Sequence, residues 1–528
     1  MRAGCVRRPS APRARETGSD TELPARAVPT TMYHFTRRGL VWRWAESAGI
    51  PSERKSIGPL PPIGRMLSLG RLHFRAGHRK SSTLVRCAVA RTDETHLARM
   101  RVLVVHNRFR SENPSGEDRV VDQEHAALSR AGHEVTRFER HSDDIAAYST
   151  YEKARVPVQM LWSFHAANEF AGVARIFRPD VVHVHSVFPL ISPSVLRACQ
   201  SLRVPMVITV HAYDLVCCSG NLFRTGVECR ECVGRRLPLP GVVHGCYRNS
   251  RMATFPIAAA MVAHRRTWRN LPDAYIFLSH AQHRELLSLG LPPGRCFVKP
   301  NFTTSARRRE HSQRRLVLYL GRLDEGKGVR VLMRAWDRYL AMPGPRALRL
   351  AIAGSGPLER EVRAWARDRR SVEMHGLVGR DRCTELLARA SAAVVPSEWP
   401  EPFGLVAIEA MSAGVPPIAT TQGALRELIT DNVDGLLYPP GDDVSLATLL
   451  QRVQDSPEWC TQLGAAAIES YERRFTEAAN LPQLVDIYRF AIAHPRWVEG
   501  REPGPLPVTN PHADESGSSA STMADHQG

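Results

Sequence analysis

Short runs of apolar, often β-branched residues alternate along the middle of the chain with longer stretches whose apolar positions recur at helical spacing. This alternation is typical of β-α-β units, in which helices cover both faces of a parallel sheet. The runs fall into two series separated by a segment without periodicity. The predicted strands are Val102–His106, Val181–His185, Pro205–Val210 and Ala274–Leu278 in the first series, and Leu316–Leu320, Leu348–Ala353, Ala392–Val395 and Pro417–Ala419 in the second.

Two doubly wound α/β sheets are therefore predicted, one in each half of the chain. The length of 528 residues also favours more than one hydrophobic core. Periodicity is lost between Pro300 and Arg315, so we expect an N-terminal Rossmann-like domain over residues 100–300 and a C-terminal one over 301–495. Ligands of such sheets bind beyond the carboxyl ends of the strands, which places the expected site in a crevice between the domains.

The two ends of the chain differ from this middle part. Residues 1–99 hold 19 basic and 7 acidic residues, so +12 of the net charge of +18 lies there, and Arg and Pro recur without a sustained period. We expect a disordered basic leader over 1–99 and a disordered Gly-, Pro- and Ser-rich tail over 496–528. The working protein is expected to begin at Met100. A targeting peptide or a tether to an anionic membrane surface is the alternative interpretation of the leader.

Composition narrows the possible partners. No run of 18 apolar residues occurs, so no membrane-spanning helix is predicted. We expect a cytoplasmic protein, and the basic leader leaves open a peripheral contact with the inner face of a membrane. Outside the leader the net charge is only +6, and interleaved aromatic and basic residues are lacking, which argues against a nucleic-acid partner.

The first candidate for ligand chemistry is a lysine that follows the first strand of the second series. Lysine is rare in this chain, and the five are Lys55, Lys80, Lys153, Lys299 and Lys327. Lys327 lies in the glycine-rich segment 321–328, between that strand and a predicted helix. Together with Arg322 and the N–H groups of the helix start, it is suited to hold a diphosphate. The alternative is a solvated turn with two surface charges.

Two further motifs follow in the second half. Gly354 is part of a tight Gly-Ser-Gly turn after a strand, where a backbone can approach a nucleotide closely. The segment 397–411 places Glu401 in a loop and starts a helix, whose N–H groups at Phe403, Gly404 and Leu405 can face an anion. Glu409 falls inside this helix among apolar neighbours, where it needs partners such as ribose hydroxyls; a partly exposed helix glutamate is the alternative.

The order and spacing of these motifs resemble the large retaining glycosyltransferase family four, which has the GT-B fold of two facing Rossmann-like domains. The resemblance covers roughly residues 100–495. The matching segments are 321–328, 354–357, 375–378, 401–409, 416–423 and 434–441.

This resemblance implies a role for each matched residue. Arg322 and Lys327 would bind the phosphates of a nucleotide-sugar donor, Glu409 its ribose, and Glu401 would face the transferred sugar. The two cations and the helix N–H groups would stabilise the leaving diphosphate, so no divalent metal or other cofactor is expected for catalysis. Transfer would occur with retention of configuration.

The first half resembles a cysteine-containing branch of the same family. Gly116, Glu117 and Asp118 follow the first strand and resemble a Gly-Gly-Glu-Asp loop near the acceptor and the donor phosphates. A His-Val-His segment ends the strand at 181–185, and His211 ends the next strand. A strand-end histidine in the crevice can hydrogen-bond the donor sugar or an acceptor, so His211 joins Glu401 as a candidate catalytic residue; a structural histidine is the alternative.

Four cysteines lie within one predicted loop of the first half. Cys217, Cys229, Cys232 and Cys246 form a Cys-x11-Cys-x2-Cys-x13-Cys array, and Cys218 is an additional neighbour. In a cytosolic protein this spacing favours a closed structural zinc site over disulfides. A set of reduced cysteines in a flexible acceptor flap is the alternative.

The predicted function is thus the transfer of a sugar from a UDP- or GDP-type nucleotide-sugar to an acceptor. A polysaccharide, a glycolipid and a small molecule all remain open as the acceptor. Two alternatives belong to other classes. One is another GT-B enzyme, such as a nucleotide-sugar epimerase or a phosphorylase; the other is a binding module built on the cysteine array.

Overall fold

The structure is a computed structural model that describes residues 99–111, 115–304 and 315–497. The predicted disordered leader and most of the predicted tail lie outside these residues. No helix in the described part of the chain is long and apolar enough to cross a membrane.

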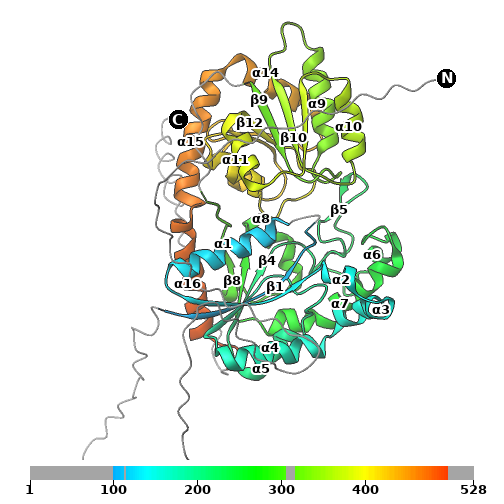
Figure 1. The fold of residues 1–528 in the computed structure, drawn as a ribbon, viewed down its shortest axis with the longest axis vertical. Helices are drawn as coiled ribbons and strands as arrows, with labels where there is room; N and C mark the ends of the chain where they lie inside the picture. The colour runs from blue at the N-terminus through cyan, green and yellow to red at the C-terminus, as the bar shows by residue number, and fades with distance from the viewer. Residues whose placement is uncertain (1–98, 112–114, 305–314, 498–528) are drawn as a thin grey trace, which may run out of the picture. The chain divides into compact units, whose positions relative to one another are not determined.

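The N-terminal half contains a six-stranded parallel sheet in the order β2-β1-β3-β4-β7-β8 (Figure 1). Its strands are β1 (Arg101–Arg108), β2 (Glu134–His141), β3 (Val181–Val184), β4 (Met206–Val210), β7 (Ala274–Phe277) and β8 (Cys296–Val298). The strand order reverses between β1 and β3, and such a switch point opens a crevice at the carboxyl ends of the two strands.

Helices cover both faces of this sheet. They are α1 (Gly116–Arg130), α2 (Asp144–Ala147), α3 (Thr150–Leu161), α4 (Phe164–Phe177), α5 (Ser194–Leu202), α6 (Leu239–His244), α7 (Arg251–Asn270) and α8 (His280–Leu286). The segment between β4 and α7, which includes α6, carries the predicted cysteine loop. Its short hairpin is formed by β5 (Phe223–Arg224) and β6 (Val227–Glu228).

The C-terminal half repeats the architecture with the strand order β11-β10-β9-β12-β13-β14. The strands are β9 (Leu316–Leu320), β10 (Arg349–Ala353), β11 (Val372–Gly376), β12 (Ala390–Val395), β13 (Pro417–Thr420) and β14 (Leu436–Tyr438), and all pairs are parallel. The helices are α9 (Val329–Ala341), α10 (Glu359–Arg367), α11 (Arg380–Arg389), α12 (Leu405–Ser412), α13 (Leu425–Leu428), α14 (Asp443–Asp455) and α15 (Pro457–Arg474). The switch point lies between β9 and β12, so the Lys327 segment and the Glu401 segment begin side by side.

The last helix, α16 (Glu477–Ala493), returns to the N-terminal half (Figure 1). Its apolar residues, among them Leu484, Ile487 and Tyr488, are buried against Met100 and Val102 in one core cluster. From its position in the chain, this segment is predicted to belong to the C-terminal domain. Helical periodicity shows that a helix has an apolar face, but it does not show which sheet that face covers.

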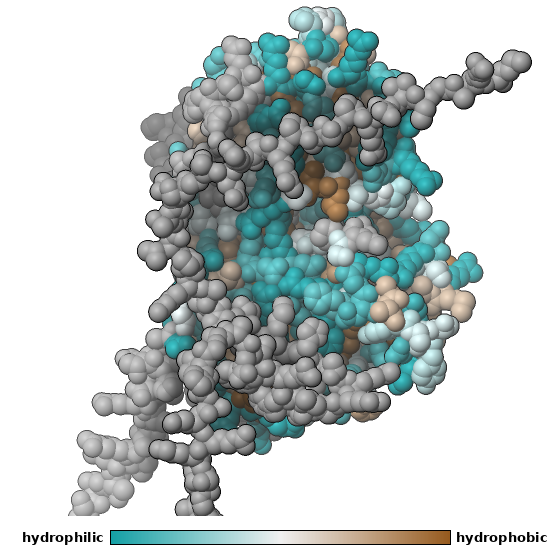
Figure 2. Space-filling model, viewed as in Figure 1, coloured by the Kyte–Doolittle hydropathy of each residue, from teal (hydrophilic) through white to brown (hydrophobic). Residues whose placement is uncertain are grey.

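The two halves also contact each other directly, between the residues that follow β7 and those around the start of α12. Leu278, at the end of β7, packs in the same core cluster as Phe403 and Leu425 of the C-terminal half. The Ser279 hydroxyl donates a hydrogen bond to the Pro402 carbonyl at 2.9 Å. On the face shown in Figure 2 the coloured surface is mostly hydrophilic, with small, separate apolar patches.

Candidate active site

The loop after β9 places a lysine against a glutamate. The Lys327 ammonium lies 2.6 Å from Oε1 of Glu401 and 4.9 Å from the centre of the Trp399 ring. The Ser397 hydroxyl donates to the same carboxylate oxygen at 2.6 Å. Glu401 is buried, with 5% of its surface exposed. The two residues that the sequence assigned to the phosphates and the sugar are therefore direct neighbours.

Arg322 is arranged differently from Lys327. Its guanidinium pairs with Asp324 within the same loop at 2.6 Å, and 61% of its side chain is exposed. The arginine is therefore free to turn toward an incoming ligand, whereas the lysine is already held in the site.

Two glycines let the loops pack backbone against backbone. Gly328 has φ +68°, and a Cβ built on it would lie 1.7 Å from the carbonyl oxygen of Pro396. Gly354 has φ +151°, and its Cβ would lie 1.8 Å from the carbonyl oxygen of Gly321. Any side chain at either position would collide with backbone, so both glycines fix the shape of the Lys327 loop. Gly354 thus has a packing role in addition to its predicted proximity to a nucleotide.

The start of α12 leaves hydrogen-bond donors unused. The helix begins at Leu405, with Gly404 as its N-cap. Within the described part of the chain, no group accepts a hydrogen bond from the backbone N–H of Phe403, Gly404 or Leu405. These donors, at the positive end of the helix dipole, are available to an anion beside Lys327 and Glu401.

Glu409 lies further along α12 and forms an ion pair with Arg119 of α1. Burial raises the pKa of the Glu409 carboxyl, although Arg119 and Arg380 lower it in part. A cavity of about 570 Å³ adjoins this contact and is lined from both halves, with Arg119 and Asp118 on one side and Arg380 on the other.

In the N-terminal half, Gly116, Glu117 and Asp118 form the first turn of α1, where the sequence analysis predicted a loop. The reason is a local cap: the Ser115 hydroxyl accepts a hydrogen bond from the Glu117 N–H at 3.2 Å. Ser115 replaces a glycine of the resembled motif and here serves as the N-cap. The first turn of a helix still presents backbone donors and side chains to the crevice.

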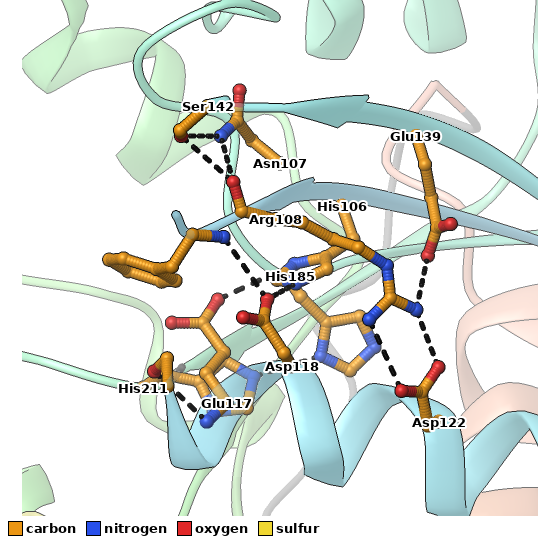
Figure 3. Close-up of polar contacts among 12 residues, drawn as sticks. His106, Asn107, Arg108, Glu117, Asp118, Asp122, Glu139, Ser142, His185 and His211 are labelled. Carbon is orange, nitrogen blue, oxygen red and sulfur yellow. Dashed lines mark hydrogen bonds and ion pairs between the residues drawn. The ribbon is translucent and has the colours of Figure 1, made fainter. Parts of the chain in front are cut away.

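The acidic residues of this turn face β1 (Figure 3). Asp118 Oδ1 lies 2.7 Å from Nε2 of the buried His106, and Glu117 Oε1 lies 3.6 Å from Nδ1 of the same ring. Burial, together with the charges of Asp214 and Asp118, raises the pKa of Glu117 well above its usual range.

Gly116 brings this turn close to the C-terminal half. A Cβ placed on Gly116 would lie 2.8 Å from Cδ1 of Leu405, the first residue of α12. On the other side of the site, a Cβ placed on Gly326 would lie 3.6 Å from the Phe223 ring of the cysteine segment. The predicted residues of the two halves thus line one region, at the carboxyl ends of both sheets.

His211 follows β4 and contacts a second histidine. Its Nε2 lies 2.8 Å from Nδ1 of His185, the residue after β3 (Figure 3). Burial lowers the pKa of both histidines well below the usual value, and neighbouring positive groups lower it further. Both rings are therefore neutral near pH 7.

Several residues of this region carried no predicted role in the sequence. His106 ends the first predicted strand, and His185 ends the second, at the switch point of the sheet. Their positions at strand ends were a usable signal. Glu124 is a buried acid on the apolar face of α1, which is also a readable signal, because a lone buried carboxylate needs a partner.

The four cysteines predicted to bind zinc do not form a ligand set. They line one small pocket together with Cys218, and all are free thiols. A tetrahedral zinc site with Zn–S bonds of about 2.3 Å holds its sulfurs about 3.8 Å apart. Among the described residues, one group of three His, Cys, Asp or Glu side chains has ligand atoms within 4.8 Å of one another, and it contains no cysteine. The structure therefore does not support the predicted zinc site.

Comparison with known proteins agrees with this geometry. Residues 114–307 match the family model described as Glycosyltransferase Family 4, and residues 302–470 match the one described as Glycosyl transferases group 1. A glycogen synthase of Mycobacterium tuberculosis is 29% identical over 76% of this chain and 98% of its own length. A D-inositol 3-phosphate glycosyltransferase of Corynebacterium diphtheriae is 29% identical over 67% of this chain and 82% of its own.

A solved sucrose-phosphate synthase from Thermosynechococcus elongatus superposes with a TM-score of 0.55 at 20% identity, over 75% of this chain and 99% of its own. Together these findings define an enzyme, a glycosyltransferase with the GT-B fold that uses a nucleotide-sugar donor. The chain belongs to glycosyltransferase family 4, whose two matched models follow each other along residues 114–470. The epimerase, phosphorylase and binding-module alternatives gain no support from these matches.

Proposed function

We propose that the enzyme transfers a hexose from a UDP- or GDP-sugar to its acceptor with retention of configuration and without a catalytic metal. The observation that carries this proposal is the contact of Lys327 with Glu401, 2.6 Å apart, beside the unused N–H groups at the start of α12. A cation, an anion and free helix donors at one point suit a leaving diphosphate and a sugar ring that becomes positively charged.

In this proposal the donor diphosphate lies between Lys327 and the start of α12. Arg322 turns from Asp324 to the phosphates, which its exposure allows. The positive charge that a metal supplies in other transferases then comes from these two side chains and the helix dipole. We expect turnover to be unchanged when divalent metals are removed with EDTA.

Glu409 is proposed to bind the donor ribose. Its carboxylate is buried and already paired with Arg119, so the two ribose hydroxyls would take over part of this interaction. Donor binding then separates α12 from Arg119 of the other half. The released guanidinium stays beside the cavity that both halves line.

Glu401 is proposed to orient the transferred sugar and to stabilise positive charge on its ring. Double displacement requires a nucleophile and a partner acid or base, which in retaining hydrolases stand about 5 Å apart. Glu401 is instead held by Lys327 and Ser397, both donors to one of its oxygens. We therefore propose that the acceptor attacks from the face that the diphosphate leaves, with His211 and the first turn of α1, Gly116–Asp118, near the reacting groups.

The acceptor is proposed to be a glycan, a glycolipid or a small molecule. Three buried polar atoms near the crevice lack hydrogen-bond partners in the described residues: Glu117 Oε1, the Tyr213 hydroxyl and Trp399 Nε1. Buried groups of this kind are normally satisfied, and the hydroxyls of bound sugars would satisfy them. A lipid-linked acceptor would bring the enzyme to the inner surface of a membrane, in keeping with the basic leader.

The proposal is tested by incubating the protein with a panel of radiolabelled UDP- and GDP-sugars and measuring slow hydrolysis of the donor. One donor should be hydrolysed above all others. NMR of the product should show an α-linkage from an α-linked donor, and a β-linked product would overturn the retaining assignment. Loss of turnover in EDTA, restored by a divalent ion, would overturn metal independence.

A further inference from the structure

Five side chains form a buried cluster next to His211: Glu124 of α1, His183 and His185 at the end of β3, Lys299 after β8, and Tyr488 of α16. The other four residues besides Tyr488, which are all ionisable, are each at most 6% exposed. Buried polar groups are costly unless they are paired, so the pairing within this cluster is informative.

Most of the cluster is satisfied. The Lys299 ammonium donates to Glu124 Oε1 at 3.0 Å and to the Pro300 carbonyl at 3.1 Å. His183 uses both ring nitrogens, with Nδ1 2.7 Å from the Tyr488 hydroxyl and Nε2 2.7 Å from the Thr209 hydroxyl. These contacts fix the orientation of the carboxylate and of the His183 ring.

Two atoms of the cluster are left without a hydrogen-bond partner in the described residues: Glu124 Oε2 and His185 Nε2. They lie 3.8 Å apart, and the other nitrogen of His185 contacts His211. Glu124, His183 and His185 also have ligand atoms within 4.8 Å of one another, as a metal site requires. However, the Lys299 ammonium already balances the charge of Glu124, and the Tyr488 hydroxyl already hydrogen-bonds His183 Nδ1. A metal cation would therefore bind weakly at this cluster.

The carboxylate decides which nitrogen of His185 carries its proton. A neutral imidazole has one N–H donor and one lone-pair acceptor. A lone pair on Nε2 would face the negative Glu124 oxygen and be repelled, whereas an N–H there is attracted. With the proton on Nε2, His185 Nδ1 is an acceptor, and the 2.8 Å contact then requires His211 Nε2 to donate.

We infer that Glu124 is a positioning residue of the transferase site, which acts through His185 to hold His211 in the tautomer with a free lone pair on Nδ1. In the described part of the chain, the hydrogen bond of the His211 ring is the one between its Nε2 and His185. Nδ1 therefore presents an acceptor to a sugar hydroxyl or to the proton of an attacking acceptor. This role for His211 rests on the proposed function, whereas the tautomer does not.

Two further features agree with this chain of donors. Both histidines are kept neutral by burial, and a neutral pair is what a single directed hydrogen bond needs. The arrangement has the logic of other sites in which a buried carboxylate fixes the tautomer of a catalytic histidine without taking its proton.

The first test is direct: the full chain, labelled with ¹⁵N-histidine, is studied by long-range ¹H–¹⁵N NMR, with signals assigned by His185→Gln and His211→Gln. His211 should carry its proton on Nε2 and have an unprotonated Nδ1 near pH 7. A proton on Nδ1 of His211 in the unmodified enzyme would overturn the inference, whatever the enzyme turns over.

The second test is Glu124→Gln. Lys299 requires an oxygen on its side, so the amide NH₂ of the glutamine must face His185 Nε2 and reverse both tautomers. We expect the His211 proton to move to Nδ1 and donor hydrolysis to fall about 100-fold, the effect of losing one aligned transition-state contact. UDP affinity should change less than about threefold, because the diphosphate site is in the other half.

Tyr488→Phe is the matched control. It removes a hydroxyl from the same buried cluster but lies off the path from Glu124 to His211. The His211 tautomer and turnover should both stay as in the unmodified enzyme. Equal losses in both variants, or an unchanged tautomer in a folded Glu124→Gln protein, would show that the carboxylate has only a structural role.

Discussion

The two halves of this enzyme share an architecture but assemble their polar groups differently. In the C-terminal half, Lys327, Ser397, Trp399 and Glu401 meet across two loops that leave adjacent strands. In the N-terminal half, the groups around His211 come from four separate elements or the residues just after them, namely α1, β3, β8 and α16. Among the described residues every buried histidine lies in this half: His106, His133, His183, His185 and His264.

This difference separates two kinds of information in the sequence. The proposed phosphate site is built from two short loop segments, and each segment is visible as a motif because spacing along a short segment fixes spacing in the fold. A network assembled from distant elements has no such spacing. Its members look like isolated buried charges until the strand order brings them together. If the two halves differ in chemistry as well as in the arrangement of their polar groups, substitutions in them should have different effects.

The largest effect is expected from Glu401→Gln. The amide keeps its contacts with Lys327 and Ser397 but loses the negative charge, which matters mainly when the sugar ring becomes positive. Turnover should fall about 100- to 1000-fold while UDP affinity changes little. Glu398→Gln is the matched control, since Glu398 is on the same loop but is not the carboxylate that pairs with Lys327. Full activity of Glu401→Gln would remove Glu401 from the catalytic residues.

Lys327→Ala should follow, with UDP or GDP binding weakened about 100-fold by calorimetry. Each charge-assisted contact contributes about 1.5–3 kcal/mol, and the substitution also leaves the buried Glu401 without its cation. Lys153→Ala changes an exposed lysine on α3 and should leave affinity unaltered. Unaltered affinity of the Lys327 variant would refute the phosphate role.

Acid should destabilise the N-terminal half. Burial lowers the pKa of His183 to about 4 in the folded state, against a usual value near 6.5. The unfolded chain therefore binds more protons between these values, and stability is lost as the pH falls from 7 to 5, by about 2 kcal/mol for this residue. His185 and His211 act in the same direction, while Asp273, whose pKa burial raises to about 6, acts against them.

Urea unfolding at pH 7 and pH 5 measures this loss. His183→Gln should flatten the pH dependence by a similar amount, because glutamine does not titrate. A variant whose stability varies with pH as steeply as that of the unmodified protein would show that another group is responsible.

The smallest effect concerns the cysteine segment. The neighbouring Cys218 thiol lowers the pKa of Cys232 to about 7, so a larger fraction of this thiol is ionised at pH 7 than of an ordinary thiol. Iodoacetamide should modify Cys232 about tenfold faster than an ordinary thiol, as followed by peptide mass spectrometry. Cys296, whose pKa burial raises to about 12, is the internal control. If Cys232 were modified slowly and a chelator accelerated the reaction, the result would indicate that the cysteine segment binds a metal.

The sequence was sufficient for the eight central strands and missed the four at the sheet edges. The missed strands are β2, β8, β11 and β14, which end the two strand orders. Central strands are covered on both faces and appear as continuous apolar runs. Three of the edge strands, β2, β8 and β11, have mostly half-buried residues, and β14 is only three residues long. Their patterns therefore resemble loops.

The candidate site was predictable to a similar degree. Lys327 and Glu401 were found because glycine and proline mark their loops. Glu124 and Lys299 were not, since 175 residues separate two groups that lie 3.0 Å apart. The cysteine spacing suggested zinc, but spacing does not specify how a hairpin and a short helix orient the thiols.

The return of α16 has a consequence for how the enzyme is made and recombined. The C-terminal half is, in chain order, an insertion between β8 and the last element of the N-terminal half. On the ribosome the N-terminal half starts before the C-terminal half and finishes after it, because its core stays open until α16 emerges. A chimera that exchanges C-terminal halves between relatives must therefore be cut at two junctions, one near residue 300 and one near residue 475, and must keep its own α16.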